Sequence, residues 1–158
     1  MTLFVETPSF TFRLERVRNL RERAEERARE ELSAELRIRD ELSAALRAAD
    51  DAVDAARAAS RGAVASGRVS VAELRGLQTF IERREQLRAG ASLDLDRQDA
   101  EVVIKRDRLA AAARDRQAID KLRDRRKAEH EAEWALKIQS QLDELALAVH
   151  RRGGALAA

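Results

Sequence analysis

The chain has 158 residues, which is enough for one modest domain. It carries 31 Lys and Arg against 29 Asp and Glu, so 38% of its residues are charged while the net charge is only +2. Aromatic residues make up 3%, which excludes a globular core rich in large side chains. Ala, Leu, Arg and Glu dominate and form helices readily, so the composition predicts long helices or a coiled coil. Disorder is the alternative for so charged a chain, but it usually brings more Pro, Gly and Ser.

The chain contains no cysteine, which excludes a disulfide framework and thiol chemistry. No apolar run approaches the length that a membrane span requires. The opening residues, MTLFVETPSF, lack the basic start and the apolar core of a signal peptide. We therefore expect a cytosolic protein that contacts membranes only through a partner.

A first helix is expected over residues 11–61, after an N-terminal lead-in over residues 1–10. Pro8 precedes this helix, and Ser9 or Thr11 can cap its first turn. Glu and Arg recur at steps of three and four through its first half, which is typical of the solvated outside of a helical rod. The residues expected to face the returning helix there are Leu14, Val17, Ala24 and Ala28.

A turn is expected over residues 62–70, where Gly62 and Gly67 lie among small and β-branched residues. Gly62 can adopt the left-handed conformation that ends a helix. Ser70 and Glu73 form an S-x-x-E capping box, in which each side chain accepts a hydrogen bond from the backbone amide of the other residue. One helix therefore ends and another begins in this segment.

A second, longer helix is expected over residues 71–150, followed by a flexible tail over residues 151–158. Gly90 costs about 1 kcal/mol relative to Ala inside a helix, so we expect a kink there, with a complete break as the alternative. No strands are expected. The predicted fold is all-α: two long helices that form an antiparallel coiled-coil hairpin.

Both helices carry the alternating steps of three and four that define a coiled-coil seam. On the second helix this spacing extends from Leu74 to Ile119, with polar residues at five of fourteen positions. A turn near Gly67 pairs residues whose numbers add up to about 133, so the pairing should end near residue 123 and leave an overhang. The seam positions of the first helix are Leu42, Leu46, Ala49, Val53, Ala56, Ser60 and Ala63.

Four large apolar residues follow the turn closely: Leu74, Leu77, Phe80 and Ile81. The residues expected opposite them are smaller: Val53, Ala56, Ala59 and Ser60. Because small side chains cannot cover four large ones, part of this turn-end cluster should stay exposed. Either the cluster simply widens the seam, as the general preference of such residues for burial suggests, or it binds a partner.

The expected overhang keeps an apolar stripe at steps of four, four, three and four: Trp134, Ile138, Leu142, Leu145 and Val149. Three interpretations are open. The N-terminal segment containing Leu3, Phe4, Val5, Phe10 and Phe12 can fold back over the start of this overhang stripe, two chains can pair their overhangs, or a partner can bind. We favour a partner and expect a partly accessible Trp134, because exposed apolar patches usually mark interaction sites.

No catalytic, metal or cofactor site is expected. His130 and His150 lie twenty residues apart, and neither has a second ligand at metal spacing. No glycine-rich phosphate motif is present, and a two-helix rod offers no cleft that shifts pKa values. The stretch 105–127 holds ten Lys and Arg and four acidic residues. Nucleic acid is one target for it, but it lacks interleaved aromatics, and an acidic protein surface fits at least as well.

Three segments together resemble the flagellar export FliJ proteins. FTFRLERVRNLRERAEERARE resembles the opening of that family, LRGLQTFIERREQL its second helix just after the turn, and DKLRDRRKAEHEAEWALKIQSQLDELALA its C-terminal stretch. The resemblance spans nearly the whole chain and keeps the order of the parts. The chain departs from the family in the middle, where tyrosine is absent and Arg84 and Arg88 occupy seam positions.

The resemblance implies a non-enzymatic coiled coil of the flagellar type III export apparatus, with no cofactor. It implies a stalk-like protein that inserts into the hexameric export ATPase ring and contacts the cytoplasmic domain of the export gate. Such a protein assists export of flagellar subunits, handles empty export chaperones and so serves motility and chemotaxis. It would be cytoplasmic and peripheral to the cell membrane at the flagellar base. The alternatives are an injectisome stalk homologue, a nucleic-acid-associated coiled coil and a plain scaffold.

Overall fold

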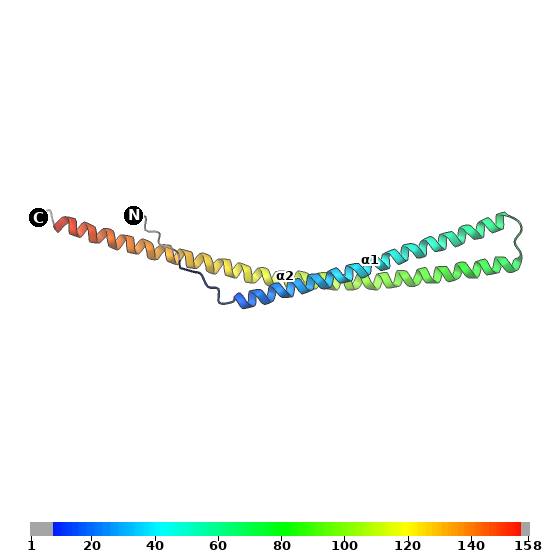
Figure 1. Cartoon of the computed structure of the whole chain (residues 1–158), viewed down its shortest axis with the longest axis horizontal. Coiled ribbons are helices and arrows are strands. Elements are labelled where there is room, and N and C mark those ends of the chain that lie inside the picture. The colour runs from blue at the N-terminus through cyan, green and yellow to red at the C-terminus, as the bar shows by residue number, and fades with distance from the viewer. Residues whose placement is uncertain (1–7, 156–158) are drawn as a thin grey trace. The chain divides into compact units, whose positions relative to one another are not determined.

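The computed structural model describes the backbone of residues 8–155 and the side chains of residues 8–151. Over this range the chain forms two helices and no strand: α1 spans Glu15–Ala65 and α2 spans Val71–Ala155. The two helices run antiparallel and pack against each other (Figure 1). The predicted all-α hairpin with a longer second helix is therefore confirmed.

The outer ends of both helices differ from the sequence-based bounds. α1 begins at Glu15 and not near residue 11, so neither Ser9 nor Thr11 caps it. The chain instead enters the helix through a turn, in which the Glu15 amide donates to the carbonyl oxygen of Phe12 at 3.1 Å. α2 continues to Ala155, past the expected end at residue 150. The remaining parts of the lead-in and the tail, residues 1–7 and 156–158, lie outside the described residues.

At the turn, the glycine that ends α1 is Gly67 and not Gly62. Gly62 remains inside α1, whereas Gly67 has a φ of 64°, the left-handed conformation that glycine adopts without steric cost. The amides of Ser66 and Gly67 donate to the last carbonyls of the helix, which closes it. The helix continues past Gly62 because Ala63 still packs half-buried in the seam.

The capping box at the start of α2 is confirmed. The Ser70 amide donates to Glu73 Oε2 at 2.7 Å, and the Glu73 amide donates to Ser70 Oγ at 3.2 Å. These hydrogen bonds to Ser70 lower the pKa of the Glu73 carboxyl. Farther along, α2 passes through Gly90 as one uninterrupted helix, so the alternative of a complete break there was wrong.

Contacts divide the chain into two compact units, which we describe separately. The turn unit comprises residues 24–112, and the terminal unit comprises the described parts of residues 1–23 and 113–158. In the turn unit the seam is buried most deeply at Val53, Ala56 and Val102. All seven expected seam positions of α1 are buried or half-buried, and on α2 only Leu74 and Arg88 are more exposed. The coiled-coil spacing therefore predicted the packed face of the turn unit correctly. In the terminal unit, Leu14 and Val17 were also expected to face α2, but they are 39% and 37% exposed.

Polar seam residues of the turn unit are paired across the two helices. Gln98 Nε2 donates to the backbone carbonyl of Glu35 at 3.1 Å and to its carboxylate at 2.6 Å. Arg39 bonds Asp99 at 2.7 Å, and Arg88 pairs with Asp50. The residue numbers add up to 133 for Glu35–Gln98, as expected, and to 138 for the two arginine pairs. Because many seam side chains are small, these polar pairs help to specify the register.

Candidate functional site

The turn-end cluster lies in the first three turns of α2, where the capping box at Ser70 fixes the start of the helix. Its members divide into two pairs. Leu77 and Ile81 face the seam and are half-buried, whereas Leu74 is 38% exposed and Phe80 is 46% exposed. Beneath them, Val53 and Ala56 are almost fully buried, as expected for small residues opposite large ones.

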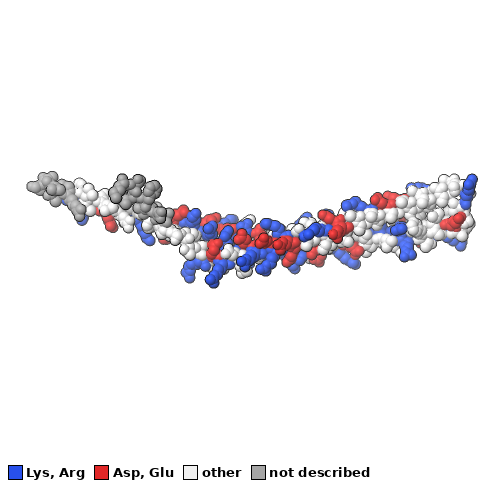
Figure 2. Space-filling model, viewed as in Figure 1, with Lys and Arg blue, Asp and Glu red and all other residues white. Residues whose placement is uncertain are grey.

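Two valines that sequence analysis did not include extend the exposed surface at the turn. Val64 is 59% exposed at the end of α1, and Val71 is 67% exposed at the start of α2. Both lie off the seam, so coiled-coil spacing gave no reason to select them; their position beside the turn was the one available signal. Figure 2 shows uncharged side chains gathered toward the turn, while the middle of the chain is crowded with charges of both signs.

The guanidinium of Arg84 lies over the exposed ring of Phe80 in the turn-end cluster. The guanidinium carbon of Arg84 lies 4.9 Å from the centre of the Phe80 ring, a cation–π contact on the surface of α2. A shallow hollow adjoins the cluster; its volume is about 440 Å³, and Ala63, Arg68, Val69, Glu73, Gly76 and Leu77 line it. The turn unit therefore presents an apolar surface with a hollow beside it and cations at its edge.

The overhang stripe lies in the terminal unit, on the part of α2 that continues beyond the start of α1 (Figure 1). Trp134 and Ile138 are half-buried. Exposure is greater farther along the stripe: Leu142 is 56%, Leu145 61% and Val149 70% exposed. Among the described residues, α1 does not extend along this apolar face, because α1 begins only at Glu15.

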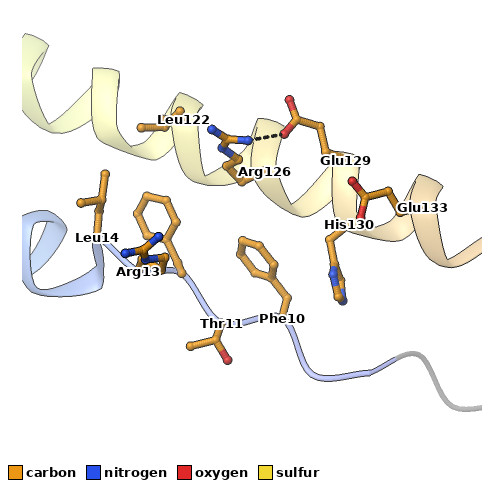
Figure 3. A pocket seen from close by; sticks show the side chains of 10 residues that line it. Phe10, Thr11, Arg13, Leu14, Leu122, Arg126, Glu129, His130 and Glu133 are labelled. Atoms are coloured by element: carbon orange, nitrogen blue, oxygen red, sulfur yellow. Dashed lines mark hydrogen bonds and ion pairs between the residues drawn. The ribbon is translucent and has the colours of Figure 1, made fainter.

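Residues 8–12 contact α2 just before the overhang stripe. Phe10 stacks near Phe12, with ring centres 6.4 Å apart, and packs against the His130 ring at 5.8 Å. His130 Nε2 lies 3.1 Å from the backbone carbonyl oxygen of Pro8 and donates to it. Figure 3 shows these side chains around an open cavity of about 630 Å³ between the lead-in and α2.

This contact bears on the three interpretations of the overhang. Phe10 and Phe12 do lie along α2, and they line the same cavity as Leu122, His130 and Glu133. The described contacts of these two rings with α2 extend no farther than the cavity that Glu133 lines, and Leu142, Leu145 and Val149 of the stripe remain exposed. The other members of the proposed covering segment, Leu3, Phe4 and Val5, lie outside the described residues.

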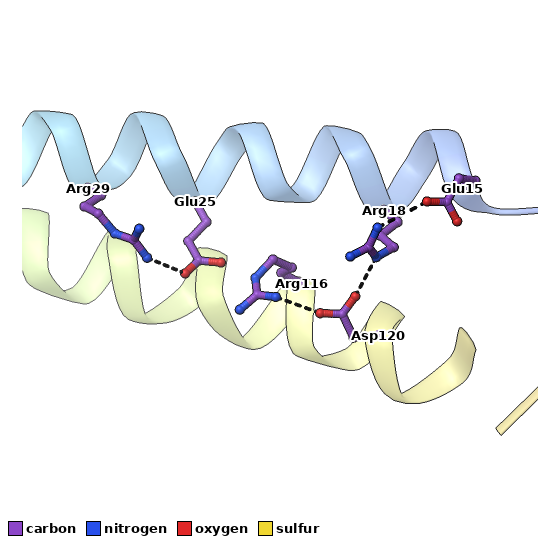
Figure 4. A network of polar contacts seen from close by, with 6 residues as sticks. All are labelled: Glu15, Arg18, Glu25, Arg29, Arg116 and Asp120. Atoms are coloured by element: carbon purple, nitrogen blue, oxygen red, sulfur yellow. Dashed lines mark hydrogen bonds and ion pairs between the residues drawn. The ribbon is translucent and has the colours of Figure 1, made fainter. Parts of the chain in front are cut away.

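An ion-pair network joins the two helices within the terminal unit (Figure 4). Asp120 accepts from Arg18 at 2.8 Å and from Arg116 at 2.7 Å, and Arg18 also bonds Glu15 at 3.2 Å. The hydrogen bond from Arg18, helped by the positive charges of Arg116 and Arg123, lowers the pKa of the Asp120 carboxyl. The same bond to Asp120 raises the pKa of the Arg18 guanidinium. The network therefore locks the register near the start of α1.

The turn unit contains one charged residue that is buried, among those described. Glu25 is 8% exposed and accepts a hydrogen bond from Arg29 at 3.1 Å, one turn along α1 (Figure 4). Lys105 bonds Glu31 at 2.9 Å, and this bond lowers the pKa of the Glu31 carboxyl. Buried charge in this seam is thus accompanied by opposite charge, which offsets part of its desolvation cost.

Much of the basic stretch 105–127 is neutralised locally. Six of its ten cations form ion pairs: Lys105, Arg116, Arg123, Arg125, Arg126 and Lys127. Their partners include Glu15 and Glu31 on α1 and Glu129 on α2. A nucleic-acid site needs uncompensated cations that replace counterions along the phosphates, so the observed pairing disfavours that function.

No metal chemistry is indicated by the described part of the chain, which holds no group of three or more His, Asp or Glu side chains able to bind an ion. His130 contacts the lead-in, and His150 is exposed on α2. Neither described helix is apolar over a stretch long enough to cross a membrane.

Comparisons with curated proteins and with solved structures gave no match. Comparison with protein families gave one: the family described as flagellar FliJ protein matches residues 10–155. The matched range contains the lead-in rings, both helices, the turn-end cluster and the overhang stripe. The chain therefore belongs to the FliJ family.

Proposed function

We propose that this chain is a stalk-like, non-enzymatic component of the flagellar type III export apparatus. It binds the export ATPase ring through the overhang stripe and the export gate through the turn-end cluster. Membership of the FliJ family gives it a role in flagellar protein export. The observation that supports two binding partners is that each unit carries its own exposed apolar surface, outside the packed seam.

The overhang stripe suits insertion into a ring or a groove. Its five members project from one face of a single helix at steps of three and four, which is the spacing of anchors in helix-in-groove recognition. Leu142, Leu145 and Val149 are each more than half exposed. Burying such side chains yields about 25 cal/mol per Å² of apolar surface, so a partner that encloses the helix gains from all of them.

The turn-end cluster suits a flatter partner surface. Leu74 and Phe80 project from it, Val64 and Val71 widen it, and Arg84 holds the Phe80 ring in place. Aromatic side chains and Arg at the centre of an interface contribute most to binding in general. The cytoplasmic domain of the export gate is the partner we assign to this surface.

Through these two contacts the protein assists export of flagellar subunits and the recycling of empty export chaperones. It works in the cytoplasm, peripheral to the membrane at the flagellar base and held there by its partners. No step of this function requires a catalytic residue or a cofactor.

The test uses two double variants and purified partners. Ile138→Ala with Leu142→Ala should weaken binding to the export ATPase by tenfold or more, since each anchor contributes about 1–2 kcal/mol, and should leave gate binding unchanged. Leu74→Ala with Phe80→Ala, at the two members of the turn-end cluster that project from the surface, should do the reverse. Leu93→Ala is the control, because this leucine is 57% exposed on α2 but lies on neither surface. If both double variants bind both partners normally while keeping their helical circular dichroism, the assignment is wrong.

A further inference from the structure

One flank of the seam near the turn can be identified from an ion pair between the helices. Arg57 on α1 bonds Glu85 on α2 at 2.6 Å, so these two side chains lie on the same flank. Residues seven or eleven positions apart lie on nearly the same face of a helix, because 3.6 residues make one turn. Val64 follows Arg57 by seven residues, and Leu74 precedes Glu85 by eleven. Val64 and Leu74 therefore project on this flank, from α1 and α2 respectively.

Three exposed aliphatic residues make up the surface of this flank, which we call the aliphatic flank: Val64, Val71 and Leu74. Val71 precedes Leu74 by three residues, so the two are neighbours on the surface of α2. Val64 is 59% exposed, Val71 67% and Leu74 38%. The packed seam thus leaves an apolar surface uncovered beside the turn, and both helices contribute to it.

Two arginines border the aliphatic flank. Arg61 precedes Val64 by three residues, and Arg75 follows Val71 by four, so each arginine is a surface neighbour of an exposed valine. Both arginines are exposed, and neither guanidinium forms an ion pair or a hydrogen bond within the described chain. One cation on each helix is therefore available at the edge of the apolar surface.

The carboxylates of this part of the chain do not neutralise the two arginines. Glu73 and Glu85 are already bonded within the turn unit, the first in the capping box and the second in the ion pair. Asp54 and Glu82 each lie seven residues farther from the turn than the arginine on the same helix, which is about 10 Å along the helix axis. Because the Debye length at physiological salt is about 8 Å, the aliphatic flank is positive next to the turn.

From this arrangement we infer that the gate surface bound by the turn end is acidic, with carboxylates around an apolar centre. The inference rests on the proposed function and names the chemistry of that partner. The guanidinium of Arg offers a planar fork of donors that matches a carboxylate, so Arg61 and Arg75 select acidic groups at the edge of the contact. The aliphatic flank covers the apolar centre. Complementary charge of this kind raises the rate of association and fixes the register of binding.

Binding of the whole chain to the purified cytoplasmic domain of the gate, measured at two salt concentrations, tests the inference. At about 0.1 M salt, Arg61→Glu with Arg75→Glu should weaken binding about tenfold, mainly through slower association, because two attractions become two repulsions. At about 1 M salt this difference should largely disappear, since the Debye length falls to about 3 Å. Arg27→Glu with Arg106→Glu is the matched control. It makes the same charge change at two exposed arginines of the turn unit that form no ion pair in the described chain.

Several outcomes would overturn the inference. If the variant at Arg61 and Arg75 binds the gate domain as well as the control does, the gate surface is not acidic, although the proposed function stands. Wild-type affinity that is the same at both salt concentrations leads to the same conclusion and needs no variant. Wild-type chain that does not bind the gate domain at either concentration overturns the proposed function, and this inference with it. Vesicles of phosphatidylcholine and phosphatidylserine test the other anionic partner: wild type alone should not bind them, and retention that the substitutions at Arg61 and Arg75 abolish would assign the flank to lipid phosphates instead.

Discussion

The Nε2 atom of His130 lies 3.1 Å from the backbone carbonyl oxygen of Pro8, although the two residues are 122 positions apart in the chain. Together with the Phe10 ring against His130, this bond holds an extended, non-helical segment along α2. Residues 8–12 therefore have a defined place in the terminal unit, and their contribution to stability is measurable.

Phe10→Ala should lower the free energy of unfolding by about 1 kcal/mol. Fully buried Phe residues lose about 3–5 kcal/mol on truncation, and Phe10 is only half-buried against His130 and Phe12. Urea denaturation followed by circular dichroism at 222 nm measures the change. Leu20→Ala, at a leucine that is 59% exposed on α1 of the same unit, should change stability by less. Equal effects of the two substitutions would show that the lead-in does not pack on α2 in solution.

Local signals in the sequence predicted most of the hairpin. The capping box at Ser70 and Glu73 could be identified because both partners lie within one turn of helix. The seam could be identified because a repeat of three and four residues reports one packed face, and Val53 and Ala56 are indeed buried. These features depend on neighbours in the chain, so no knowledge of the fold was needed to find them.

Features that depend on distant contacts were harder to predict. Gly62 and Gly67 are equally able to end a helix, and the choice depends on whether Ala63 still has a partner to pack against. The hydrogen bond between His130 and Pro8 follows no repeating spacing in the sequence, so no pattern could predict it. The start of α1 was placed too early for a similar reason, because the residues before Glu15 bind α2 instead of forming a helical turn.

Acid should weaken the terminal unit through Asp120. The hydrogen bond from Arg18 lowers the pKa of this carboxyl in the folded chain, whereas an unfolded Asp has a pKa of about 3.9. A carboxyl with a depressed folded pKa contributes its stabilisation above the unfolded pKa and loses it as the pH falls through the folded pKa. Asp120→Asn should therefore destabilise the chain at neutral pH and have a shrinking effect below about pH 4.

Urea midpoints of wild type and Asp120→Asn, measured from neutral pH down to about pH 2, test this dependence. Asp124→Asn is the matched control, since Asp124 is an exposed carboxylate on the same helix that forms no ion pair among the described residues. It should have little effect at either end of the range. A constant difference between wild type and Asp120→Asn at all pH values would argue that the ion-pair network does not stabilise the fold.

Two glycines should respond in opposite directions to the same substitution. Gly90→Ala should stabilise the chain by about 1 kcal/mol, because Gly90 is inside a continuous helix and Ala is the better helix former. Gly67→Ala should destabilise it by about 1–2 kcal/mol, because a φ of 64° is strained for a residue with a side chain. An added Cβ meets no atom within 4 Å at either position, so steric clashes do not confuse the comparison. Thermal unfolding gives both values, and a destabilising Gly90→Ala would indicate a distorted helix there.

Trp134 is the one tryptophan in the sequence and lies at the start of the overhang stripe, so its fluorescence reports directly on that surface. In the dilute chain its side chain is half-buried, and its emission should be quenched measurably by acrylamide. If the export ATPase encloses the stripe, adding it should shift the emission to shorter wavelength and reduce quenching several-fold, as water is excluded from the indole. The Trp134→Phe variant, mixed with the ATPase in the same way, supplies the background from the ATPase itself. Emission from dilute chain that is already blue-shifted and resists quenching would mean that the stripe is buried without any partner. An emission that stays unchanged when the ATPase is bound would place the contact elsewhere on the chain.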